Sequence, residues 1–301
     1  MLAEWALVAV PGLIWGCSFL LIAVGLEALP ADGVTFVRFA VGFAALACVP
    51  AARRPVRRED RAGIAWLGLL WLALPMSMFP HAERHVSSAV TGMLNGAIPV
   101  LAAAVAALLA RRLPSRATAL ALAVGCAGAV LVALPEASTG AASAKGVALI
   151  AVALVSYGVA INLARPLQQR NGALPVVWRA LGVALVATAP LGLPALRHAR
   201  FTAEALLAVI ALGALGTALA NVVMAVAAGR LGATRASGTT FLIPVVALAL
   251  GVLVRDERVA PLAIVGGAVC LLGAWLLRRA PAPADGYPFH PADAVSHHRM
   301  R

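Results

Sequence analysis

The chain has 301 residues, of which 62% are hydrophobic and 12% charged, and its formal net charge is +12. A water-soluble domain of this length cannot bury so much apolar surface, so the composition excludes a soluble enzyme and indicates a protein embedded in lipid. The positive charge does not indicate nucleic-acid binding, because the basic residues lie in short loops between apolar segments.

Ten apolar segments follow one another along the chain. Each is close to the ~20 residues that cross the hydrocarbon core of a bilayer, and Gly, Pro or charged residues separate most of them. No basic residue precedes the first, so we expect a retained helix rather than a cleaved signal peptide. The third contains Pro75 and Pro80, which predict a kink. The predicted spans are residues 5–26, 33–50, 62–81, 88–110, 116–134, 145–164, 174–193, 204–228, 237–254 and 260–278.

The second half of the chain repeats the pattern of the first. An aromatic-Gly pair, an arginine and a proline recur in the same order, 142, 141 and 145 residues later. The paired positions are Trp15 and Tyr157, Arg38 and Arg179, and Pro99 and Pro244. Five spans in each half place the second half upside down in the membrane, as in many secondary transporters. We therefore predict an all-α integral membrane protein with ten transmembrane helices, built as two inverted five-helix repeats over residues 1–135 and 144–279.

The distribution of Lys and Arg predicts the orientation in the membrane. If the N-terminus is cytoplasmic, sixteen of these residues fall on the cytoplasmic side, six on the other side and two within spans. The positive-inside rule then favours a protein of the cytoplasmic membrane with both termini in the cytoplasm. Residues 280–301 are rich in Pro, Ala and His and predict a disordered cytoplasmic tail.

These motifs, in this order, resemble the EamA family of the drug/metabolite transporter (DMT) superfamily. The resemblance covers residues 5–278 and implies ten helices in two inverted repeats, cytoplasmic termini, and export of small metabolites such as amino acids. The matching pieces are Trp15-Gly16-Cys17-Ser18-Phe19, Arg38-Phe39 and Ala97-Ile98-Pro99-Val100 in the first half, and Tyr157-Gly158, Arg179, Ile243-Pro244-Val245 and Arg255-Asp256-Glu257-Arg258-Val259 in the second.

One position departs from the pattern of that family. The family usually ends its fourth and ninth helices with Gly-Glu-Arg or a similar sequence. Glu257, thirteen residues after Pro244, fits the ninth helix, but the same count from Pro99 reaches Arg112. The first half has therefore lost its acidic residue, which puts in doubt any role that needs both acids.

Arg38 and Arg179 are the clearest candidates for substrate binding. A charged side chain within a span costs about 2.5–3.5 kcal/mol on insertion scales, so it usually faces protein or a water-filled cavity. There a guanidinium binds a carboxylate or phosphate bidentately. Each arginine lies only five to six residues into its span. Snorkelling to the membrane edge and bonding to helix-end carbonyls are therefore the alternatives.

Four further side chains are candidates for lining the same midplane cavity. They are Trp15, Asn95, Tyr157 and Asn221. Trp and Tyr combine an apolar ring with one donor, and Asn can bond a substrate. Bonds between neighbouring helices and an interfacial aromatic belt are the alternatives. The prolines of the repeated motif, Pro99 and Pro244, are candidate hinges.

No metal or cofactor site is expected. His81 and His85 lie on one helix face, but Glu83 does not follow the first histidine directly as it does in the H-E-x-x-H zinc motif. The four cysteines lack C-x-x-C spacing, and no nucleotide-binding or nucleophile-elbow motif occurs. Transport would then be passive or coupled to an ion, and protons stay open as that ion.

The sequence therefore predicts a secondary transporter that exports a small metabolite, with a small-molecule substrate and the lipid bilayer as its partners. Alternating access would rock one repeat against the other. Two alternatives stay open, an integral-membrane enzyme acting on lipid-linked substrates and a non-transporting scaffold.

Overall fold

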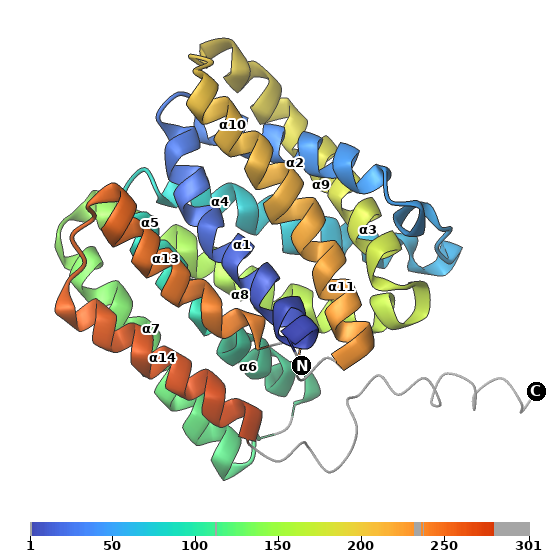
Figure 1. The fold of residues 1–301 in the computed structure, drawn as a ribbon. Coiled ribbons are helices and arrows are strands. Elements are labelled where there is room, and N and C mark those ends of the chain that lie inside the picture. Colours follow the sequence, from blue (N-terminus) through green and yellow to red (C-terminus); the bar gives the residue numbers. More distant parts are fainter. Residues whose placement is uncertain (1, 112, 232–235, 237, 280–301) are drawn as a thin grey trace, which may run out of the picture.

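The computed structural model describes residues 2–111, 113–231, 236 and 238–279. Within these ranges every regular element is a helix (Figure 1), so the described fold is all-α as predicted. The predicted tail, residues 280–301, and Arg112 lie outside the described residues.

The helices follow the predicted spans to within a few residues at most ends. The largest difference is at the sixth span, where the helix is 31 residues long and extends past residue 164. The helices are α1 (Leu2–Leu26), α2 (Ala31–Ala47), α3 (Arg61–Leu67), α4 (Leu74–Ala82), α5 (Ser88–Leu94), α6 (Ile98–Ala110), α7 (Arg116–Ser138), α8 (Ala141–Asn171), α9 (Ala173–Ala195), α10 (Ala203–Ala211), α11 (Ala220–Leu231), α13 (Thr239–Arg255) and α14 (Pro261–Arg279).

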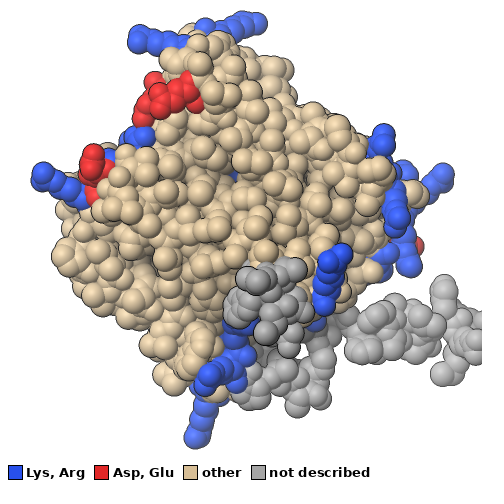
Figure 2. Space-filling model, in the orientation of Figure 1, with Lys and Arg blue, Asp and Glu red and all other residues tan. Residues whose placement is uncertain are grey.

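Eight helical segments of the described residues are long and apolar enough to cross a membrane, and α13 is a shorter apolar helix. Large apolar side chains on their outer faces are exposed, among them Leu108 at 76%, Val186 at 73% and Leu253 at 79%. Figure 2 shows charged side chains at the upper-left and lower-right edges of one face, with a wide uncharged area between them. Such a surface suits lipid as solvent, so the chain is a multi-pass integral membrane protein.

Three spans are not continuous α-helices. A π-helical turn, η3 (Gly68–Ala73), separates α3 from α4 and comes directly before Pro75. A 3-10 turn, η4 (Asn95–Ala97), separates α5 from α6 and comes before Pro99. Because proline has no N–H to donate to the preceding turn, both interruptions have a local cause. The predicted kink in the third span is thus a π-helical turn.

A second π-helical turn has no proline to explain it. It is η6 (Leu212–Leu219), which joins α10 to α11 in the eighth predicted span. Gly213 lies against the backbone oxygen of Arg38, so a Cβ at Gly213 would be only 2.7 Å from that oxygen. The sequence does not predict this turn, since its form depends on how closely α2 packs against it.

Helices from the two halves pack against each other in pairs. Figure 1 shows α1 beside α13, α2 beside α9, and α7 beside α14. Glycines bring α7 and α14 close, because a Cβ at Gly128 would lie 2.3 Å from the backbone nitrogen of Cys270.

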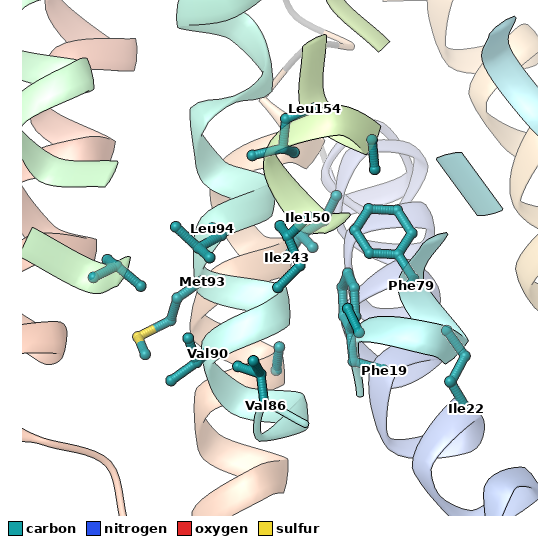
Figure 3. Packing of buried hydrophobic residues seen from close by; sticks show 14 of the residues in the cluster. Phe19, Ile22, Phe79, Val86, Val90, Met93, Leu94, Ile150, Leu154 and Ile243 are labelled. Carbon is teal, nitrogen blue, oxygen red and sulfur yellow. The ribbon is translucent and has the colours of Figure 1, made fainter. Parts of the chain in front are cut away.

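The main hydrophobic core joins α1, α4, α5, α8 and α13. Figure 3 shows Phe19 and Phe79 next to each other in this cluster, and their rings meet edge to face at 5.8 Å. Two of the predicted site residues belong to this region, since Tyr157 is part of the core and Trp15 packs against it.

Candidate functional site

Arg38 is buried inside the protein rather than at the membrane edge. It lies on α2 and is only 5% exposed. Its Nε donates to Thr217 Oγ1 at 3.0 Å, and that hydroxyl donates in turn to the backbone oxygen of Leu212 at 3.3 Å. Thr217 belongs to η6, so the bond joins the two halves of the chain. The π-helical turn therefore holds a guanidinium that lipid would not solvate.

Two other predicted site residues meet the same turn. Trp15 Nε1 donates to the backbone oxygen of Gly216 at 2.9 Å, and Asn221 Nδ2 donates to the backbone oxygen of Thr217 at 2.7 Å. Trp15, Arg38 and Asn221 thus converge on two consecutive residues of η6. We call this set, with Thr217, the η6 cluster.

Tyr157 approaches the η6 cluster from α8. Its ring stacks on Phe79 with a centroid distance of 6.0 Å and an interplanar angle of 28°. The residue is buried, and it interacts electrostatically with Arg38. A guanidinium and a phenol from opposite halves therefore share one buried region, with an aromatic stack as its wall.

Asn95 lies where the fourth span is interrupted. It is the first residue of η4, and its Oδ1 is buried without a donor among the described residues. The next residue, Gly96, faces Pro244 of α13, because a Cβ there would lie 2.9 Å from Pro244 Cγ. The structure therefore places η4, the interruption before Pro99, beside Pro244, although Pro244 itself lies within a continuous helix.

Arg179 lies apart from the η6 cluster. Its Nη1 donates to the backbone oxygens of Pro175 at 3.1 Å and Ala52 at 3.4 Å, and its guanidinium lies 5.4 Å from the ring of Trp178. It also lines an open apolar groove with Phe43. The two arginines that the repeat pairs in sequence therefore have different surroundings.

A polar pocket that the sequence does not predict lies where α1, α4 and α13 end and α5 begins. Its volume is about 310 Å³, and we call it the Glu83 pocket. Its lining residues are Ala23, Leu26, Glu27, Glu83, Arg84, Val86, Ser87, Ser88, Arg255 and Glu257. The sequence signal that pointed here was Glu257, which fits the family pattern.

Glu257 ties the two halves together at this pocket. Its Oε1 accepts from the backbone nitrogen of Ser88 at 3.0 Å and from Ser88 Oγ at 2.7 Å, and its Oε2 accepts from the backbone nitrogen of Ala89 at 2.8 Å. These are free donors at the start of α5, so the carboxylate caps that helix. Arg255 reaches Glu27 with an N–O distance of 2.7 Å.

Histidines and acids do not gather into a metal site within the described residues. His81 Nε2 lies 3.0 Å from Asp32 Oδ1, and the backbone oxygen of His85 accepts from Ser143 Oγ at 3.2 Å. The two histidines therefore have separate partners.

Comparison with known proteins gives a family model, a relative and solved structures that match this chain. The model of the EamA-like transporter family matches twice, over residues 3–134 and 144–279. A protein of Streptantibioticus cattleyicolor named "probable terminal-alkyne amino-acid exporter" is 30% identical over 281 residues, which cover 92% of this chain and 93% of the relative. A solved crystal structure, described only as that of a protein, superimposes with a TM-score of 0.58 at 19% identity. It covers 90% of this chain and 98% of its own, which supports the fold alone.

Proposed function

The chain belongs to the EamA-like transporter family of the DMT superfamily, and we propose that it exports small metabolites such as amino acids by alternating access. The family and the exporter-named relative point to transport rather than catalysis. The substrate class named for that relative supports an amino acid or a related compound.

The proposed architecture is ten membrane crossings in two inverted repeats. The crossings are the eight long apolar segments together with α2 and α13. The two family matches, over residues 3–134 and 144–279, support it. The helix contacts support it as well, because exchanging the halves leaves them similar. The contact of α1 with α13 in one arrangement corresponds to that of α8 with α6 in the other, and α2 packs on its counterpart α9. The π-helical turn of each half packs on the second helix of the other half, η3 on α9 and η6 on α2. Such exchange is expected of a molecule with internal two-fold symmetry.

The proposed orientation puts both termini in the cytoplasm and the Glu83 pocket outside the cell. The abundance of arginine near the loop after α2 and near the ends of α11 and α14 supports it under the positive-inside rule. In this orientation the membrane is the cytoplasmic membrane, and the pocket is the exit end of an export path.

One observation carries the proposed transport mechanism, namely the buried bond from Arg38 to Thr217 between the two halves. A guanidinium in this position binds a substrate carboxylate once the halves separate enough to admit it. In this proposal aromatic and polar contacts to the substrate come from Trp15, Tyr157, Asn221 and Asn95, whose Oδ1 has no donor among the described residues. Because Arg38 is buried, substrate reaches it only through helix movement, with Pro99 and Pro244 as the proposed hinges.

Arg179 has a different proposed role. Its bond to the backbone oxygen of Ala52 ties α9 to the loop after α2. We therefore assign Arg179 to holding that loop, which makes it a matched control for Arg38.

Efflux from proteoliposomes tests the proposal. The liposomes hold labelled amino acids, including propargylglycine as a terminal-alkyne amino acid. We expect saturable efflux with the wild type and a loss of about tenfold or more in Arg38→Ala, since bonds to a charged group are worth about 1.5–3 kcal/mol. Arg38→Lys keeps the charge without the planar fork and gives an intermediate rate.

Arg179→Ala serves as the control and retains most of the flux. Size-exclusion chromatography in detergent checks that each variant folds. Unchanged flux in a folded Arg38→Ala protein would overturn the role of Arg38. The absence of flux for the whole panel, with a folded wild type, would contradict the proposed substrate class.

A further inference from the structure

Glu83 carries a buried carboxyl group at the end of α4. The residue follows the last turn of α4, and its backbone nitrogen donates to the oxygen of Phe79 at 2.9 Å. Within the described part of the chain, both Oε1 and Oε2 are buried and neither accepts a hydrogen bond. The same side chain lines the Glu83 pocket.

Charged groups of both signs surround this carboxyl group. Glu257 and Arg255, from the end of α13, and Arg38, from α2, act on it directly. Other titratable groups also lie on the elements packed at this end of the bundle. They are Glu27 after α1, Asp32 on α2, His81 on α4, Arg84 and His85 in the loop that follows, and Lys145 and Tyr157 on α8.

An ionised carboxylate is costly in such a place. A buried charge without hydrogen bonds loses its hydration and gains nothing in return. Burial raises the pKa of Glu83 well above its ordinary value of 4.5, and the negative charge of Glu257 raises it further. Arg255 and Arg38 act in the opposite direction but do not outweigh burial. Burial without a hydrogen-bond donor therefore favours the neutral carboxylic acid in this conformation.

We propose that Glu83 is a proton-binding site of the transport cycle, which takes up a proton from the Glu83 pocket when that end of the protein closes. The carboxylate and one proton from water form the carboxylic acid, and the proton returns to water when the pocket opens and hydrates the group. The proposal rests on the proposed transport function for its role in the cycle, but the protonation itself does not depend on it.

The neighbouring acid shows why closure and protonation go together. The two carboxyl oxygens of Glu257 accept hydrogen bonds from three donors at the start of α5. Because these three donors already bond Glu257, they are not available to Glu83, whose oxygens have no donor among the described residues. Closing the pocket around both acids therefore favours the neutral form of Glu83, because the nearby charge of Glu257 disfavours a second carboxylate.

Infrared spectroscopy of the full-length protein in lipid nanodiscs tests the protonation without any substrate. We expect the carbonyl band of a neutral carboxylic acid, at the frequency of a weakly hydrogen-bonded group, to persist well above the ordinary pKa of Glu. The band should be absent in Glu83→Gln, which has nearly the shape of the neutral acid and is expected to fold. Glu27→Gln is the matched control, because Glu27 lines the same pocket but its side chain is 56% exposed.

Either of two results would overturn the proposal. The first is that the carbonyl band is missing from the wild type at neutral pH, and the second is that the band remains in Glu83→Gln.

Transport measurements then test the role in the cycle, with labelled propargylglycine as the probe. A pH gradient across the liposome should change wild-type accumulation by up to on the order of tenfold per pH unit for one coupled proton. In Glu83→Gln the gradient should have no effect, while exchange without a gradient continues. An equal effect of the gradient in both proteins would overturn the role of Glu83. If neither protein moves the probe, the proposed function has failed, and the infrared result still decides the protonation.

Discussion

Two buried carboxylic acids, Asp60 and Glu83, lie at opposite ends of the protein in opposite circumstances. Asp60 is 5% exposed and accepts hydrogen bonds from Arg170 and, at 2.7 Å, from Asn171 Nδ2. Asn171 Oδ1 in turn accepts from the backbone nitrogen of Arg57 at 2.9 Å. Both oxygens of Glu83 are buried, and neither has a donor among the described residues.

The difference shows two ways to bury an acid. Asp60 keeps its charge because fixed donors replace water, so its ties to the end of α8 are permanent under ordinary conditions. Glu83 has no donor among the described residues, so under the proposal it is buried with a proton, and its state depends on pH and on whether the pocket is open.

Removing the paired acid should have the largest effect. Asp60→Ala leaves Arg170 and Asn171 without their acceptor in a partly buried site. Breaking a buried ion pair costs about 3–5 kcal/mol, but the Arg170 side chain is 41% exposed, so we expect about 2–3 kcal/mol. Thermal unfolding in detergent measures the loss.

The control for this variant is Glu59→Ala on the same turn. Glu59 and Arg57 pair at 3.4 Å, but their side chains are 72% and 58% exposed, so the pair should contribute little. Equal stability of Asp60→Ala and Glu59→Ala would contradict the view of Asp60 as a fixed tie.

Weakening the cap at the Glu83 end should have an intermediate effect. Glu257→Gln keeps one acceptor oxygen and replaces the other with a donor, so at least one bond to the start of α5 is lost. We expect about 1–2 kcal/mol of local destabilisation. Hydrogen exchange should be faster at the amides of Ser88 and Ala89. Exchange at Asp60 and its neighbours serves as the internal control, and unchanged exchange at α5 would exclude the proposed tie.

Hydropathy alone predicted where most helices lie, because each span must satisfy its own backbone bonds in lipid. The buried position of Arg38 could also be anticipated, since a charge in a span usually faces protein. The groups that Arg38 contacts could not be anticipated from the sequence. Its partner, Thr217, lies 179 residues away in a π-helical turn that has no proline or other local signal.

Sequence position was a poor guide to the surroundings of Arg179 and Glu83. Arg179 occupies the same place in its repeat as Arg38, but it donates to the backbone oxygens of Pro175, one helical turn earlier, and of Ala52, whereas Arg38 donates to the side chain of Thr217. Glu83 sits in what the hydropathy shows as an ordinary loop. Its burial results from several helix ends converging around it, which is a property of packing rather than of spacing.

The smallest expected effect, and the most direct contrast with Asp60, is the pH dependence of stability at Glu83. With the proposed protonation, the folded protein holds a proton on Glu83 that the unfolded chain releases near the ordinary pKa of 4.5. Between that value and the raised pKa of the folded state, the folded protein binds more protons than the unfolded chain. Stability should therefore fall as pH rises through this interval. We expect a change of about 1 kcal/mol or less, because the pocket can open and hydrate the group before the protein unfolds.

Glu83→Gln should match the stability of the wild type in acid and exceed it at higher pH, whereas Glu27→Gln should keep the pH dependence of the wild type. Thermal unfolding measured across this pH range gives the three slopes. A wild-type curve parallel to that of Glu83→Gln would mean that Glu83 is charged in the folded protein, and that the two ends of the molecule bury their acids in the same way.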